Sequence, residues 1–277
     1  MMMKKLYKSL IFVCLAVMLS CSEEAEEVTG DDQEPPPETA IHVPADHATI
    51  QAAIDAADDG DSVVVADGIY KGEGNRDIQF RGKSITLVSE NGPGATIIDC
   101  EGTVDALHIG FNFSSTDESG TVIDGFTVRN GYSAQGSGVL LKSASPTIKN
   151  CVFINNIGTV SGGAVRLKAS SARFVNCTFV RSSAPVGAAV LMIATSRPEF
   201  ENCIIASSTG GEVVTCSDTY SGATFTCSDL FGNEGGNWVG CLTDQANDNG
   251  NMSMDPMFCD PDAGDFGLQG DSPCVGA

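Results

Sequence analysis

Three basic residues at matching positions of a sequence repeat have the chemistry of an anion-binding surface. Lys142 and Lys168 lie 26 residues apart in similar segments, and Arg166 comes two residues before Lys168. Ammonium and guanidinium groups bind carboxylates through charge-assisted hydrogen bonds, so this strip could hold an acidic sugar. The alternative is a solvated sheet face whose long side chains cover apolar surface.

Acidic residues in two loops near the C-terminal end could supply oxygen ligands for calcium. The candidate ligands are Asp244, Asp248, Asp260 and Asp262. The first loop does not follow the EF-hand spacing, because Gln245 falls where the first acid should be and Pro256 where the last Glu should be. Plain turns are the alternative for both loops, and calcium is the one cofactor that the sequence suggests.

Other catalytic centres find little support in the residue pattern. The three histidines, His42, His47 and His108, are scattered along the chain, so neither a zinc centre nor a Ser-His-Asp site is expected. No phosphate-binding loop or nucleotide fingerprint occurs, and a nucleotide partner is therefore not expected.

The basic strip belongs to a repeat of about 26 residues that contains a recurring Asn-Cys pair. The pairs are Asn150-Cys151, Asn176-Cys177 and Asn202-Cys203. The runs around them are short, rich in Val, Ile, Phe and Thr, apolar at every second position and bounded by Gly, Asn, Ser and Pro, which indicates strands. No segment between them has room for a crossover helix. The repeat therefore predicts an all-β parallel coil of roughly eight rungs, spaced about 4.8 Å apart.

Both members of the recurring pair have a structural interpretation. A turn asparagine tolerates left-handed backbone, and its amide can hydrogen-bond to the amides one rung above and below. Cysteine acts as a small buried apolar residue, and stacked side chains that point the same way are poorly aimed at each other for a disulfide. We therefore expect two structural ladders and no ligand role.

The ends of the coil need covers, because terminal rungs have open strand edges. Residues 48–57 predict a helix that Thr49 or Asp46 can cap, with an apolar stripe suited to plugging the first rung. Five cysteines follow residue 210, and we predict a disulfide-stapled C-terminal cap with Cys259–Cys274 as one staple and Cys227–Cys241 as a second. Spacing alone leaves their connectivity open.

The N-terminal residues predict export and lipid anchoring. Three lysines and a short apolar run precede Cys21, so residues 1–20 read as a lipoprotein signal peptide and Cys21 as the lipidated residue. An ordinary signal peptide cut near Cys21 is the alternative. Residues 21–40 are acidic and contain three consecutive prolines, which is typical of an extended tether. The domain proper then spans residues 41–277.

The chain is strongly acidic, with a formal net charge of −21. Removing the three lysines of the expected signal peptide from the 15 basic residues leaves 12 against 36 acidic ones, a net charge of −24. Binding nucleic acid needs a positive footprint, so nucleic acid is excluded as an expected partner.

Several segments resemble bacterial right-handed parallel β-helix repeat proteins of the pectin-lyase-like fold. They are residues Ile50–Ala57, Gly60–Tyr70, Ile85–Cys100, Ile123–Gly131 and the tail Cys227–Cys274. The phrases Gly162-Gly-Ala and Phe153-Ile-Asn-Asn also resemble the repeats of polymorphic outer-membrane proteins. The resemblance implies a right-handed parallel β-helix, but the group includes lyases, hydrolases, epimerases, adhesins and members without activity, so it does not convey a function.

The sequence leaves three functional hypotheses. The leading one is a non-catalytic lipoprotein, anchored to the outer membrane only through its lipid, whose β-helical surface binds a polysaccharide or a cell-surface protein. The second is a polysaccharide lyase or hydrolase; the resemblance implies that a lyase would take its base from Lys142, Arg166 or Lys168 and bind calcium beside it. The third is an inert structural spacer.

Overall fold

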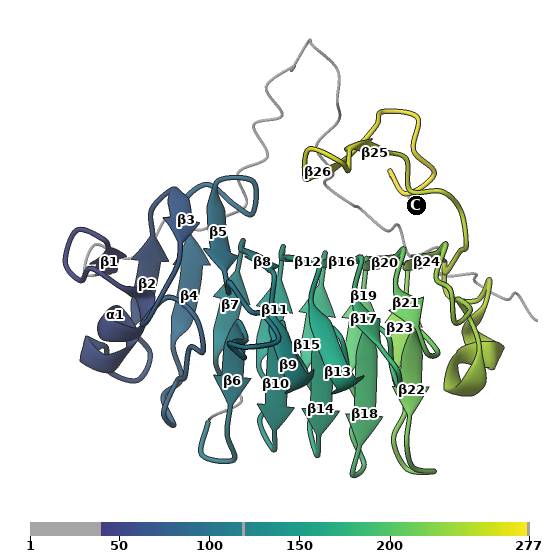
Figure 1. Ribbon diagram of the computed structural model, residues 1–277, viewed down its shortest axis with the longest axis horizontal. Coiled ribbons are helices and arrows are strands. Elements are labelled where there is room, and N and C mark those ends of the chain that lie inside the picture. Colours follow the sequence, from purple (N-terminus) through teal and green to yellow (C-terminus); the bar gives the residue numbers. More distant parts are fainter. Residues whose placement is uncertain (1–39, 118–119, 276–277) are drawn as a thin grey trace, which may run out of the picture.

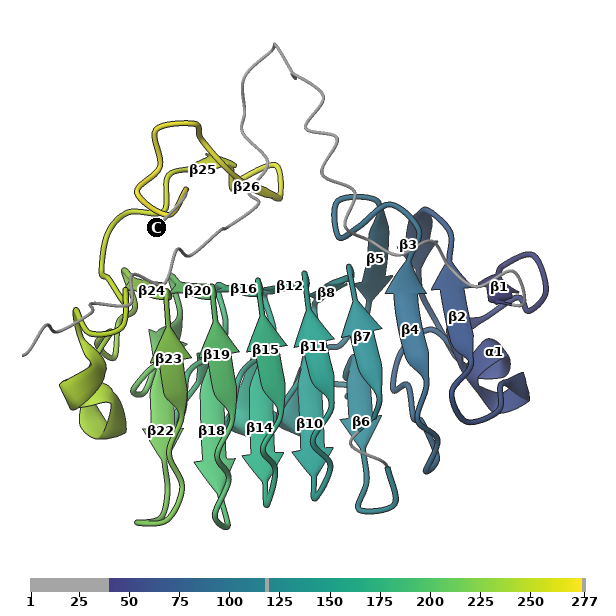
Figure 2. The same ribbon diagram turned by 180° about the vertical axis from the view of Figure 1, so that it is seen from behind.

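The computed structural model describes residues 40–117 and 120–275, which form a parallel β-helix closed at both ends (Figures 1 and 2). The predicted signal peptide, Cys21 and all of the tether except Ala40 lie outside the described residues. Each turn of the coil contributes strands to several sheets, and every pairing within the coil's sheets is parallel. The coil makes about seven turns, close to the predicted number.

Four sheets form the walls of the coil. The eight-stranded sheet has the order β1 (Ile41–Val43), β2 (Ser62–Val65), β4 (Thr86–Ser89), β7 (Val122–Asp124), β11 (Thr147–Lys149), β15 (Arg173–Val175), β19 (Glu199–Glu201), β23 (Thr224–Thr226). The seven-stranded sheet has the order β3 (Gly68–Tyr70), β5 (Thr96–Asp99), β8 (Thr127–Arg129), β12 (Val152–Ile154), β16 (Thr178–Val180), β20 (Ile204–Ala206), β24 (Asp229–Phe231). The four-stranded sheet has the order β9 (Tyr132–Gln135), β13 (Ile157–Ser161), β17 (Ser183–Ala184), β21 (Thr209–Gly210). The five-stranded sheet has the order β6 (Phe111–Phe113), β10 (Val139–Lys142), β14 (Val165–Lys168), β18 (Val190–Ile193), β22 (Val214–Cys216).

The core is built from like side chains stacked on successive turns, as the aligned repeats predict. Phe174, Phe200 and Phe225 are in-register partners, and their rings stack with centroids 4.8 and 4.5 Å apart. Phe153 stacks on Phe179 in the same way, at 4.9 Å. These side chains are fully buried, so the main apolar core runs along the inside of the coil.

Both predicted ladders are confirmed. Asn176 donates its Nδ2 to Asn150 Oδ1 at 3.1 Å and accepts from Asn202 Nδ2 at 3.2 Å, and all three residues have φ of 51–52°. Asn150 extends the chain of bonds by donating to Asp124 Oδ1 at 2.8 Å. The cysteines that follow are buried free thiols.

The predicted helix covers the first rung. It spans α1 (Ile50–Ala56), and the Thr49 hydroxyl accepts a hydrogen bond from the Ala52 N–H at its start. The apolar stripe points into the core, with Ile50 and Ile54 fully buried. Lys83 closes the other end, because its ammonium donates to three carbonyl groups around the last turn of the helix at 2.7–3.0 Å.

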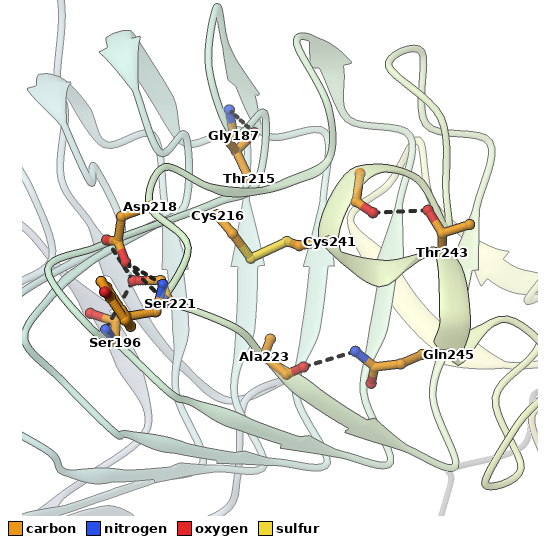
Figure 3. The surroundings of a disulfide bond; sticks show 12 residues. Gly187, Ser196, Thr215, Cys216, Asp218, Ser221, Ala223, Cys241, Thr243 and Gln245 are labelled. Atoms are coloured by element: carbon orange, nitrogen blue, oxygen red, sulfur yellow. Dashed lines mark hydrogen bonds between the residues drawn. A yellow bond between two sulfur atoms is a disulfide. The ribbon is translucent and has the colours of Figure 1, made fainter.

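The last rung is covered by the 3₁₀ helix η1 (Gly240–Gln245), which a disulfide attaches to β22 (Figure 3). Cys216 bonds to Cys241 across a Cα–Cα distance of 6.1 Å. Gln245 lies against the open edge of β23 and against Ala223, the residue that precedes this strand. The Gln245 Nε2 donates to the Ala223 carbonyl and the Gln245 Oε1 accepts from the Phe225 N–H, each at 2.8 Å. The amide thus makes the bonds that a further strand would make.

The stapled cap is confirmed, but the predicted pairings Cys227–Cys241 and Cys259–Cys274 are wrong. Cys241 is taken by Cys216, the inward residue of the last full rung, because η1 folds directly over it. Cys274 is a buried free thiol. The two predicted loops of about 15 residues looked equally suitable in sequence, whereas the observed bond joins residues 25 apart.

The C-terminal segment folds back over the outside of the seven-stranded sheet as the antiparallel hairpin β25 (Phe258–Asp260) and β26 (Asp265–Leu268), drawn in yellow in Figures 1 and 2. It forms a second small core in which Leu268 packs with Ile154, Val180 and Ile204. Arg181 fastens the hairpin by an ion pair to Asp262 at 2.9 Å and lies over the Phe266 ring.

A buried carboxylate lies beneath this segment. Asp229 accepts the Met254 N–H at 3.0 Å, and the Cys274 thiol donates to it across 3.7 Å. Burial, with a smaller contribution from the charge of Asp255, raises the pKa of Asp229 to about 6. Folding therefore favours the protonated form of Asp229 relative to the unfolded chain, and the carboxylate becomes the major form above about pH 6.

The first prediction concerns the asparagine ladder. Asn176→Ala removes two hydrogen bonds and places Cβ in left-handed backbone, so we expect the free energy of unfolding to fall by about 1–3 kcal/mol. Asn176→Gly relieves the backbone strain and should lose less. Guanidinium unfolding of both variants measures the difference, and equal stability of Asn176→Ala and wild type would contradict the ladder's role.

The second prediction concerns the staple. Replacing Cys216 and Cys241 by Ser releases a loop of 25 residues, which should cost about 3 kcal/mol in the chain-entropy description. Urea unfolding measures this loss. Peptide mapping without reductant should yield a linked Cys216–Cys241 pair, and recovery of a Cys227–Cys241 pair would overturn the assignment.

The third prediction concerns pH. Because the pKa of Asp229 is raised to about 6 in the folded protein, binding a proton at Asp229 stabilises the folded state. This contribution is complete below about pH 4 and is lost as pH rises through about 6. Asp229→Asn should therefore be more stable than wild type at pH 7.5, by about 2 kcal/mol, and similar to it at pH 4. The difference between the two unfolding curves across pH isolates Asp229, and a constant difference would refute the assignment.

Candidate functional site

The predicted basic strip lies on the outside of the five-stranded sheet. Lys142 and Lys168 are in-register partners at the ends of β10 and β14, and both side chains are exposed. Arg166 points to the same side as Lys168, because alternate residues of a strand share a face. The structure therefore brings the three predicted residues together on two adjacent turns.

The composition of this outward surface is unusual for so acidic a chain, and we call it the cation face. Its outward positions on the five strands are Asn112, Leu140, Lys142, Arg166, Lys168, Leu191, Ile193 and Thr215. None of these residues is a carboxylic acid. Within the described part of the chain, none of the three cations forms an ion pair.

Cations on the eight-stranded sheet are arranged differently. Lys149 pairs with Asp124, its in-register neighbour, at 3.0 Å. Arg173 pairs with both Glu199 and Glu201 on the next turn, at 3.2 and 3.1 Å. Neighbouring turns thus neutralise these cations, whereas the cation face leaves its positive charge available to a ligand.

Arg166 is the most enclosed member of the cation face. Two turn glycines with left-handed φ, Gly136 and Gly162, lie against its stem, and a Cβ at Gly136 would be 2.9 Å from Arg166 Cβ. Its Nε is buried and has no hydrogen-bond partner among the described residues. Desolvation lowers the pKa of Arg166. An anion at this position would satisfy the donor.

The four candidate calcium ligands do not form one site. Asp262 pairs with Arg181, Asp260 accepts the Ala263 N–H, and Asp248 accepts the Asn249 N–H. Across residues 40–117 and 120–275, no group of three or more His, Cys, Asp or Glu side chains is placed to hold a metal ion. The local contacts match the alternative interpretation as turns.

A shallow groove of about 460 Å³ lies elsewhere on the coil, where three successive turns leave the seven-stranded sheet. One wall follows β5 and includes Asp99, Glu101 and Thr103, while Asn130, Tyr132 and Asn155 come from the next two turns. Asp99 pairs with Arg129 at 3.0 Å and Glu101 with Arg76 at 2.8 Å.

The sequence analysis did not identify this groove. A usable signal was present, because Asn130 and Asn155 lie 25 residues apart and both adopt left-handed φ, of 56° and 53°. They form a second asparagine column at the exit from the sheet. The long connection after β5, which builds the wall, has no equivalent in the later repeats, so alignment of the repeats does not reveal it.

None of the described helices is both long and apolar enough to span a bilayer. No curated protein sequence matches this chain significantly. Among solved structures, pectin methylesterase from carrot matches with a TM-score of 0.41 at 14% identity, covering 72% of this chain and 64% of the enzyme. A pectin methylesterase from Aspergillus niger matches with a TM-score of 0.38 at 15% identity, covering 79% and 81%. The chain thus spans less than two thirds of the carrot enzyme, and neither likeness indicates an activity.

The family comparison is more direct. Residues 87–249, more than half of the chain, match the family model described as a right handed beta helix region. The match begins in β4 and extends past η1, so it covers the turns that carry both the cation face and the groove. The chain therefore belongs to the right-handed β-helix family.

Proposed function

We propose that this protein is a cell-envelope lipoprotein that binds an acidic glycan on its cation face, without turning it over. The observation that carries the proposal is a sheet face with three cations and no carboxylate in a chain rich in acids. The signal peptide, the lipidated Cys21 and the acidic tether belong to the same proposal and would hold the domain at the outer membrane.

The geometry suits a linear anionic chain. Lys142 and Lys168 are neighbours across one strand spacing of about 4.8 Å, so their ammonium groups can engage successive negative groups of a polymer lying along the coil axis. Arg166 adds a donor with an unused Nε beside them. The flat, open face favours a polymer that lies across it over a small enclosed ligand.

The lyase hypothesis has one observation in its favour, the lowered pKa of the Arg166 guanidinium, which desolvation produces. A lyase of the kind that the resemblance implies also needs acidic residues to hold calcium beside its base. The outward strand positions around Arg166 supply none. Binding without turnover is therefore the better supported function of this face.

The fourth prediction tests the cation face. Lys142→Ala combined with Lys168→Ala should weaken binding of polygalacturonate, alginate or dextran sulfate about tenfold, if each exposed charge contributes about 0.7 kcal/mol. Raising the salt concentration should weaken wild-type binding in the same direction. Lys149→Ala is the matched control, because Lys149 is a partly exposed lysine already paired with Asp124.

The readouts are titration calorimetry and ultraviolet absorbance from unsaturated uronate, each with and without calcium. Failure of every acidic polymer to bind, or equal binding by the double variant, would refute the proposal. Calcium-dependent absorbance that Lys168→Ala abolishes would replace it with the lyase hypothesis.

A further inference from the structure

We infer that the groove between the exits of β5, β8 and β12 is a second binding site and that it takes a neutral oligosaccharide. It is separate from the cation face, which lies on the five-stranded sheet further along each turn. Its volume of about 460 Å³ falls in the range of small-ligand sites.

The groove wall is held in place before any ligand arrives. Arg76 binds both the Cys100 carbonyl at 3.1 Å and the Glu101 carboxylate at 2.8 Å, which fixes the start of the wall. Asp77 accepts from His108 Nδ1 at 2.7 Å and from the Ile109 N–H at 2.9 Å, which fixes its end. A preformed wall reduces the ordering cost of binding.

The floor is joined to this wall by backbone bonds. His108 and Tyr132 form an antiparallel bridge in which each N–H donates to the other's carbonyl, at 3.0 and 2.8 Å. Directly opposed residues of an antiparallel pair carry their side chains on the same side. The Tyr132 side chain, which lines the groove, therefore lies on the same side of this bridge as the His108 side chain.

The charges of the groove exclude an acidic ligand. Burial would raise the pKa of Asp99, but hydrogen bonds from Asn130, the Glu101 N–H and Arg129, together with the Arg129 charge, lower it, so Asp99 stays ionised. Arg76 and Arg129 are already paired with Glu101 and Asp99. A uronate or sulfate would meet the carboxylates of Asp99 and Glu101, and no lysine or arginine among the described residues lines the groove, whereas a hydroxyl can donate to the carboxylate of Glu101.

The remaining surface offers the two kinds of contact that an uncharged sugar uses. The Asn155 side-chain amide and the Tyr132 hydroxyl make no hydrogen bond within the described residues, so they can bind ligand hydroxyls. The Tyr132 ring and Ile157, whose side chain is 38% exposed, can pack against C–H groups. Polar and apolar contacts thus converge in one groove from neighbouring turns.

The fifth prediction uses hexasaccharides of glucose, mannose, galactose and xylose as probes. At least one should bind the wild-type domain and shift the backbone NMR signals of Gly102 and Tyr132. Tyr132→Ala should weaken binding at least tenfold, and Asn155→Gly, which keeps the left-handed backbone accessible, should weaken it about fivefold, the equivalent of losing one hydrogen bond worth about 1 kcal/mol. Tyr220→Ala is the matched control, because Tyr220 is 67% exposed at a distant turn.

The two proposals can fail separately. Variants at Lys142 and Lys168 should leave hexasaccharide binding unchanged, and Tyr132→Ala should leave binding of dextran sulfate unchanged. Binding of none of the four hexasaccharides, or shifts confined to other turns, would overturn the groove assignment. Asn155→Gly and the wild-type NMR titration keep the test decisive if Tyr132→Ala does not fold.

Discussion

The in-register parallel pairing of successive turns is the constraint on which the rest of this structure depends. Each turn is hydrogen-bonded to the turn before and the turn after, so the same position of every repeat faces the same way. Stacked phenylalanines fill the inside, and a ladder of asparagine amides follows one corner. A shift of one residue in a single strand would turn its core residues outward, which explains why turn residues with fixed left-handed backbone recur at the corners.

The same pairing creates a problem at each end, where a strand edge and the core would meet water. The first rung is closed by α1, whose ends are bonded by Thr49 and Lys83. The last rung is closed by η1, where Gln245 satisfies the backbone next to β23 and the Cys216–Cys241 bond keeps the cover in place. Helical covers serve both ends because their backbone bonds are internal, so they add no new edge.

In-register stacking also decides which charged side chains meet, because outward residues at equivalent positions of adjacent turns are neighbours. On the eight-stranded sheet, Lys149 and Arg173 meet acids on adjacent turns and are neutralised. On the five-stranded sheet, Lys142 meets Lys168 and stays available to an anion. The groove has the opposite character, since its arginines are already paired with its acids. One coil therefore presents two surfaces of different charge, and the two proposals rest on this contrast.

The coil, the presence of a cover at each end and the alignment of the cation face could be predicted from the sequence. When the copies of a repeat stack in register, residues 26 positions apart become neighbours on adjacent turns. The Asn150, Asn176 and Asn202 ladder and the Thr49 cap follow from local chemistry and were predictable for that reason. The partner of Cys241 follows only from the three-dimensional fold, because it depends on η1 folding over β22 where the repeat pattern has already ended. The three-dimensional fold also decided the groove, whose wall rests on contacts of Arg76 and Asp77 with residues 24–32 positions away, outside the repeat pattern.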